Sequence, residues 1–257
     1  TFFPSLVLWS TQNLRDTVVV LVLAMLMLTA LRLRRRFGPG RLIGLFAALA
    51  LLTLLRDYMA VMAVLALVAS FLLSPARGLA RNLAVAVIVL GVALWSYQSL
   101  GLGAEWVESA SFETLDEQRR LLATGGSAFR PEADISSPLQ GVQYLPLGLA
   151  FFFLSPFPWQ LGSTLTLLTL PEMIVWYALL GFVGYGTWYL LRRRFVAVVP
   201  IVVFTAVTST VYALVEGNAG TAYRHRAQLL VFLLVFAAVG LDVLHRWRTQ
   251  RRREQAT

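Results

Sequence analysis

The sequence contains no cysteine, no lysine and only two histidines among its 257 residues. The absence of cysteine excludes disulfide bonds, thiolate metal sites and cysteine nucleophiles. The two histidines, His225 and His245, are too few to build a histidine metal or haem site, so we expect no metal and no cofactor. All 22 basic residues are arginine, a composition typical of a GC-rich bacterial genome.

Charged residues are also scarce. Only 14% of the residues are charged, 58% are hydrophobic, and the mean hydropathy is +0.71. A soluble domain is about half apolar and a quarter charged, so the chain has too little polar surface for a water-soluble globule. The net charge of +9 would suggest nucleic acid in a soluble protein. In a membrane protein it reports orientation instead, so we expect membrane lipids, and no nucleic acid, as partners.

Apolar runs long enough to cross a bilayer predict an all-α, polytopic transmembrane helix bundle of about seven spans. Residues 1–257 are expected to form a single transmembrane domain, with an extracytoplasmic loop at 103–142 and a basic cytoplasmic tail at 246–257. The expected spans are Thr17–Leu33, Leu42–Leu55, Tyr58–Ser74, Asn82–Leu102, Pro171–Leu191, Phe195–Val215 and Arg226–His245.

The arginines are distributed unevenly over the predicted loops. If the cluster at 32–41 lies in the cytoplasm, the loop with Arg77 and Arg81, the cluster at 192–194 and the tail at 246–253 lie there too. The inside then carries about +13 and the outside about −4. We therefore expect a multi-pass protein of the bacterial inner membrane, with the N-terminus of this chain outside and its C-terminus in the cytoplasm.

The same orientation constrains the segment 144–170. Both of its ends must lie outside, so it enters and leaves on one face. It is rich in aromatic residues and interrupted by Pro146, Pro156 and Pro158. We expect a re-entrant element or a helix that lies at the interface.

Ionisable residues at the ends of the predicted spans gather on the outer face, where they indicate a functional site. Arg56 and Asp57 follow an apolar run, 42–55, that is too short to reach bulk water easily. We expect Arg56 to bind an anion, with Asp57 as an orienting group or base. A salt-bridged tight turn is the alternative.

The segment 216–226 is the richest in polar residues. Its glycines allow successive backbone N–H groups to form an anion-binding nest, and its arginines are permanently charged. Its histidine exchanges a proton near neutral pH, and the helix that follows favours an anion at its N-terminus. These features predict a phosphate or pyrophosphate site, and a loop held by arginines against lipid headgroups is the alternative. The expected contributors are Gly217, Asn218, Gly220, Arg224, His225 and Arg226.

Two carboxylates begin predicted helices. Glu172 follows Pro171, and Asp16 precedes the first span. An acid in the first turn complements the helix dipole, so capping is the simpler interpretation. As functional groups, both carboxylates are candidates for a general base beside the outer site.

Five short stretches carry a resemblance: Phe3–Asp16, Leu54–Tyr58, Gly125–Phe129, Ser155–Trp159 and Gly217–Arg226. Together they resemble bacterial multispan membrane proteins of polysaccharide assembly. This group includes the GT-C type glycosyltransferases, which use lipid-linked sugars, and the O-antigen polymerases and ligases. The similarity runs over most of the chain, and it implies that the chain is the later part of a longer protein.

The resemblance implies an enzyme that uses a polyprenyl-phosphate-linked or polyprenyl-diphosphate-linked saccharide at the extracytoplasmic face. Arg56 and the two arginines of 216–226 would hold the phosphate without a metal, and His225, Glu172 or Asp16 would deprotonate the acceptor hydroxyl. A non-catalytic accessory or scaffold subunit, with other membrane subunits as partners, is the alternative. A transporter would place polar residues through the midplane of internal repeats, and the sequence shows no convincing repeat.

Overall fold

The computed structural model describes residues 16–73, 78–101, 111–159 and 164–255, and within these ranges the chain is helical, without strands. The predicted all-α class is therefore confirmed for this part of the chain. The helices are α2 (Asp16–Arg35), α3 (Pro39–Leu55), α4 (Asp57–Leu72), α5 (Leu79–Leu100), α7 (Phe112–Leu122), α8 (Pro138–Leu154), α9 (Thr164–Val215) and α10 (Ala219–Glu254).

Four helices of the described chain are long and apolar enough to cross a membrane, namely α2, α5, α9 and α10. Three further apolar helices, α3, α4 and α8, have 16 or 17 residues. The long helix α9 contains two of the expected spans. They meet at Arg194, where the backbone leaves the helical conformation and the chain kinks. These helices are those of a membrane protein, while the count of seven spans stays a prediction.

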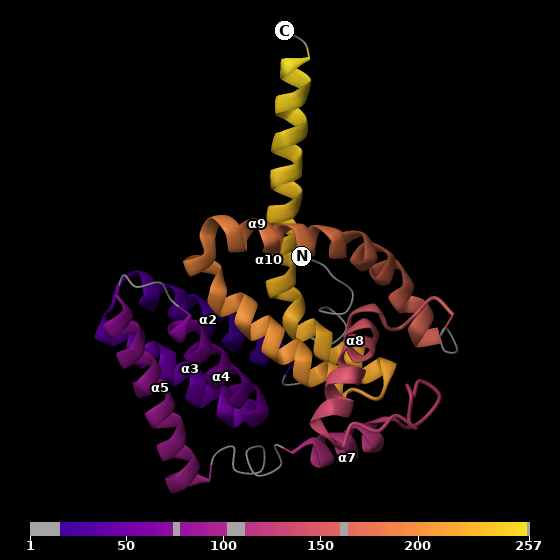
Figure 1. Ribbon diagram of the computed structural model, residues 1–257, viewed down its shortest axis with the longest axis horizontal. Helices are drawn as coiled ribbons and strands as arrows, with labels where there is room; N and C mark the ends of the chain where they lie inside the picture. Colours follow the sequence, from indigo (N-terminus) through magenta and orange to yellow (C-terminus); the bar gives the residue numbers. More distant parts are fainter. Residues whose placement is uncertain (1–15, 74–77, 102–110, 160–163, 256–257) are drawn as a thin grey trace.

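The helix ends differ from the predicted segment boundaries at two places. The polar loop was expected to reach residue 142, but α8 begins at Pro138, with Ser137 and Gln140 forming a reciprocal capping box at its start. The helix also continues through Pro146, although an interior proline removes one helical hydrogen bond and crowds the preceding turn. At the other end of the chain, the expected span and basic tail form one helix, α10, whose last turns project from the body (Figure 1).

The centre of the fold is the pair α9 and α10, on which α2, α4 and α8 pack (Figure 1). The two helices cross where Gly186 of α9 meets the backbone of α10 and Gly240 of α10 meets the backbone of α9. A Cβ atom at Gly186 would collide with the Phe236 carbonyl, and one at Gly240 with the Phe182 carbonyl. Such backbone contact requires glycine, as in other membrane helix pairs.

Helix α5 packs on α4 and otherwise presents apolar side chains outward. Val87, Leu94 and Trp95 are each more than half exposed. On a soluble protein this surface would be an aggregation hazard, whereas it suits contact with lipid chains.

The two ends of the bundle differ in charge. The Arg41 guanidinium donates to the Arg36 carbonyl at 2.5 Å, and Arg81 donates to the Arg34 carbonyl at 2.9 Å. The arginine-rich ends of α2, α3 and α5 therefore meet. At the start of α2, about 30 Å away along a 20-residue helix, a different set of polar residues gathers around Asp16.

Candidate functional site

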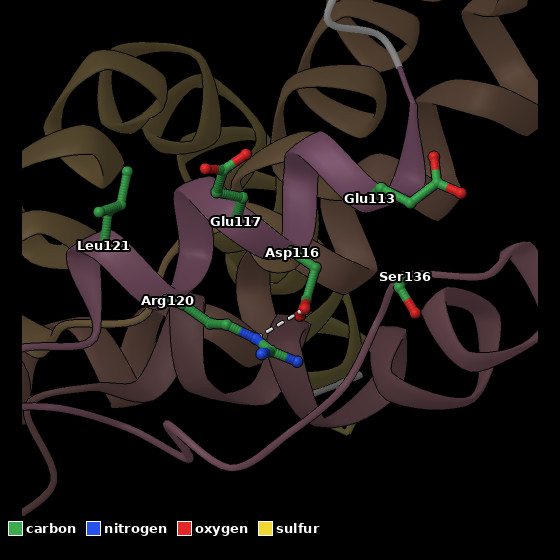
Figure 2. Close-up of a pocket in the computed structure, with 6 residues that line it drawn as sticks. All are labelled: Glu113, Asp116, Glu117, Arg120, Leu121 and Ser136. Carbon is green, nitrogen blue, oxygen red and sulfur yellow. Dashed lines mark ion pairs between the residues drawn. The ribbon is translucent and has the colours of Figure 1, made fainter.

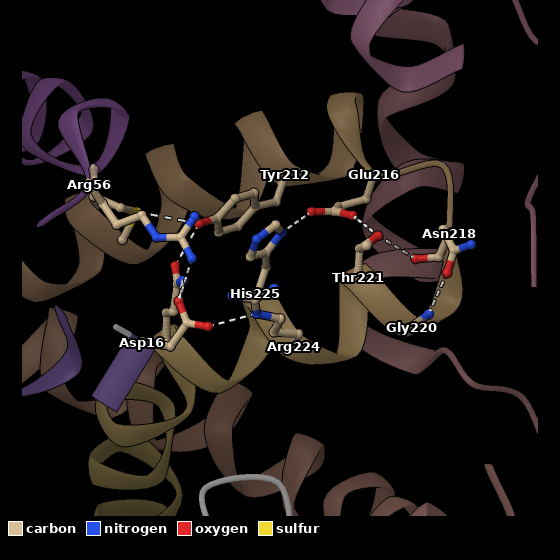
Figure 3. Close-up of polar contacts among 11 residues, drawn as sticks. Asp16, Arg56, Tyr212, Glu216, Asn218, Gly220, Thr221, Arg224 and His225 are labelled. Atoms are coloured by element: carbon tan, nitrogen blue, oxygen red, sulfur yellow. Dashed lines mark hydrogen bonds and ion pairs between the residues drawn. The ribbon is translucent and has the colours of Figure 1, made fainter. Parts of the chain in front are cut away.

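Asp16, the first residue of α2, is the centre of a polar cluster formed by three distant parts of the chain (Figure 3). One carboxylate oxygen accepts from Arg56 Nη2 at 3.1 Å and from Gln228 Nε2 at 3.3 Å. The other accepts from Arg224 Nε at 2.6 Å. We call Asp16, Arg56, Arg224 and Gln228 the Asp16 cluster. It brings together two arginines that the sequence assigned to one anion site.

The exposure of these groups decides what the cluster can bind. The Asp16 side chain is only 6% exposed, whereas those of Arg56 and Arg224 are 27% and 26% exposed. One carboxylate thus faces two guanidinium groups, which leaves one positive charge uncompensated within the cluster. Partly exposed guanidinium groups can be reached by a ligand, and their planar forks suit phosphate.

Local backbone geometry aims Arg56 at this cluster. Arg56 is extended between α3 and α4, as the C-cap of one helix and the N-cap of the next. The Asp57 carboxylate, in the first turn of α4, accepts from the Tyr58 backbone N–H at 2.8 Å. Arg56 forms its ion pair with Asp16 and not with Asp57, so the alternative of a salt-bridged turn is not what the structure shows, and the role of Asp57 as orienting group or base stays a prediction.

A second polar contact, between His225 and Glu216, lies next to the Asp16 cluster (Figure 3). His225 Nδ1 meets Glu216 Oε1, and the Thr221 hydroxyl donates to Glu216 Oε2 at 2.5 Å. The imidazole also stacks on the Tyr212 ring, with 4.8 Å between centroids and 5° between planes. We call His225 and Glu216 the His225 pair.

Tyr212 and Gln228 connect the two groups. The Tyr212 hydroxyl donates to Gln228 Oε1 at 2.6 Å, and the Gln228 amide donates to Asp16. The sequence interpretation placed Glu216 in the polar segment 216–226 without giving it a role, and it missed Tyr212 and Gln228. An acid directly after a predicted span was the only available signal for Glu216, and nothing marked a tyrosine or glutamine inside apolar helices.

The glycine-rich start of α10 has a structural role. Asn218 is the N-cap of α10 and accepts from the Gly220 amide at 2.8 Å. A Cβ atom at Gly217 would meet the Arg119 carbonyl at 2.5 Å, and Gly217 has no positive φ angle. The Ala219 and Gly220 amides are already bonded to protein atoms. Gly217 and Gly220 therefore serve the close approach to α7 and the helix cap, and a phosphate-binding nest of Gly217, Asn218 and Gly220 stays a prediction.

Arg226 and Glu172 belong to a different, buried group. Arg226 is 3% exposed and donates to the Phe153 and Ser155 carbonyls at 2.8 and 2.9 Å. Glu172 is 4% exposed and accepts from the Tyr223 hydroxyl at 2.7 Å. Arg226 thus holds the end of α8 against α10, and neither residue joins the Asp16 cluster.

A buried arginine of α7 holds the loop that follows this helix. Arg119, which is fully buried, donates to the Arg130 carbonyl at 2.7 Å and also to the Ala133 carbonyl. In the turn that follows, the carboxylate of Asp134 accepts from the Ser136 backbone amide, and this bond holds the pKa of Asp134 below its ordinary value.

The outer face of α7 lines an open groove of about 490 Å³ (Figure 2). Arg120 lines the groove and forms an ion pair with Asp116, one turn earlier on the same helix, at 2.7 Å. Three carboxylates against one arginine make the groove net negative, so it disfavours an anion. The lining residues are Glu113, Asp116, Glu117, Arg120, Leu121 and Ser136.

The motif residues 3–15, Arg77, the segment 102–110 and residues 160–163 lie outside the described residues. Among the described residues, no group of three histidine, aspartate or glutamate side chains is arranged to hold a metal ion. Comparison of the chain with protein-family models, with curated proteins and with solved structures finds no match. The function must therefore be argued from the chemistry of the Asp16 cluster and the His225 pair.

Proposed function

We propose that the protein is a membrane-embedded glycosyltransferase or polymerase that acts on polyprenyl-(di)phosphate-linked sugars at the extracytoplasmic face of a bacterial inner membrane. The observation that carries this proposal is the convergence of Arg56 and Arg224 on Asp16, from positions 168 residues apart in sequence. Two partly exposed arginines at the polar end of apolar helices suit a phosphate that is attached to a lipid chain.

In the proposed reaction, an acceptor hydroxyl forms a bond to the anomeric carbon as the bond from that carbon to the phosphate oxygen breaks. Arg56 and Arg224 stabilise the negative charge left on the phosphate. His225, as general base, takes the proton of the acceptor hydroxyl. Asp16 holds both arginines in place, because both of its oxygens are engaged by guanidinium groups.

The proposal includes the predicted topology. Seven spans require α3 and α4 to cross as a short hairpin and α9 to cross twice about its kink at Arg194. The Asp16 cluster then lies outside, and the projecting end of α10, with its arginines, lies in the cytoplasm.

The test uses the purified protein in nanodiscs with a polyprenyl-diphosphate sugar and a polyprenyl-phosphate binding assay. Arg56→Ala and Arg224→Ala should each weaken binding about tenfold or more, in line with a charge-assisted bond. Arg130→Ala is the matched control, because Arg130 is exposed and pairs only with exposed Glu132 in the described contacts. Unchanged binding and transfer in both cluster variants would refute the proposal.

A further inference from the structure

Resting on this proposed function, we infer that Glu216 is a positioning residue that holds His225 in the Nδ1–H tautomer and so leaves Nε2 as the proton acceptor. The inference follows from which atoms meet. His225 presents Nδ1 to Glu216 Oε1, and an ionised carboxylate only accepts hydrogen bonds. The nitrogen that faces it must therefore carry the proton, and in the neutral ring Nε2 then has the free lone pair.

The surroundings of Glu216 make it suited to orient a neighbour rather than to react. Its side chain is only 1% exposed, while that of His225 is 17% exposed. Its second oxygen accepts from Thr221, whose hydroxyl also contacts the Asn218 carbonyl at 3.0 Å. Substrate reaches the imidazole more easily than the carboxylate, so the carboxylate acts through the ring.

The ring plane is also held. Tyr212 lies parallel to the imidazole, and its own hydroxyl is bonded to Gln228, which in turn donates to Asp16. The orientation of the proposed base is therefore tied to the residue that holds the two arginines. This connection places base and phosphate site in one framework, as a transfer reaction requires.

Because the chain has only two histidines, the tautomer of His225 can be measured directly. Protein labelled with ¹⁵N only in histidine gives signals from His225 and His245 alone, and the variant His245→Gln assigns them. The expected wild-type result is an Nδ1–H imidazole for His225. In Glu216→Met, which keeps a long side chain without an acceptor, this preference should be lost.

Thr221→Val is the matched control, since it removes the hydroxyl that donates to Glu216 but keeps the carboxylate. It should leave the tautomer unchanged. In the transfer assay, Glu216→Met should lower kcat about 10²-fold or more while polyprenyl-phosphate binding stays within twofold of wild type. A merely structural ion pair would not separate kcat from binding in this way.

The outcomes separate the two proposals. An Nε2–H imidazole in the wild type, an unchanged tautomer in Glu216→Met, or an unchanged kcat overturns the role of Glu216. If the wild type neither binds polyprenyl phosphate nor transfers sugar, the proposed function fails, even when the tautomer is the one expected.

Discussion

At the scale of single residues, the two arginines of 216–226 have different partners and therefore different roles. Arg224 and Arg226 are two positions apart, yet Arg224 joins Asp16 at the polar end and Arg226 is buried against backbone carbonyls of α8. Side chains two residues apart on a helix do not share a face. The predicted phosphate site therefore keeps Arg224 and Arg56, while Arg226 stabilises the fold.

The cluster makes a prediction about stability. Asp16→Ala removes the carboxylate shared by Arg56 and Arg224, so their charges repel without compensation. Because both arginines are partly exposed, solvent screens the effect, and we expect a loss of about 1–2 kcal/mol. Thermal unfolding in detergent, followed by tryptophan fluorescence, should show a lower Tm. The control Glu117→Ala changes an exposed side chain of α7 and should leave Tm unchanged; equal Tm values for both variants would contradict the shared role of Asp16.

At the scale of elements, helix existence was easier to predict than helix ends. Each expected span falls largely within one apolar helix, since about 17 to 20 apolar residues dictate helical backbone in a bilayer. The start of α8 and the continuity of α10 were missed. Capping and tertiary packing decide these boundaries, and both depend on neighbours that the local pattern does not identify.

The crossing of α9 and α10 gives a prediction at this scale. Gly240→Ala places a methyl group against the Phe182 carbonyl, so the helices must separate. We expect a loss of about 1–3 kcal/mol, as for other overpacked sites. Thermal unfolding measures it. The control Gly91→Ala lies in α5, where a Cβ atom meets nothing within 4 Å, and it should be neutral or slightly stabilising because alanine is the better helix former. A Gly240→Ala protein as stable as the Gly91→Ala protein would exclude close contact.

At the scale of the whole molecule, the arginine-rich helix ends and the Asp16 cluster lie at different ends of the bundle. The arginine-rich ends of α2, α3 and α5 contact one another, whereas the starts of α2, α4 and α10 meet at Asp16. This separation is what the predicted orientation requires of the fold, and labelling from either side of the membrane measures that orientation.

The absence of cysteine allows that measurement with single introduced thiols. In intact bacterial cells with a permeable outer layer, Glu117→Cys in α7 should react with a membrane-impermeant maleimide. Gln250→Cys near the end of α10 should react only after the inner membrane is opened. The unmodified chain, which has no thiol, is the control. Labelling of both positions from the same side would contradict the orientation.

The sequence by itself determined the helical class, the membrane character and the expected orientation, because hydrophobic length and arginine placement are local properties. It also selected Arg56, Arg224, His225 and Asp16 as residues of interest. Their partners were decided by tertiary structure. Asp16 meets Arg224 across 208 residues, and His225 pairs with Glu216 through a returning turn. Such pairings depend on which helix ends the packing brings together, and no local pattern in the chain records that choice.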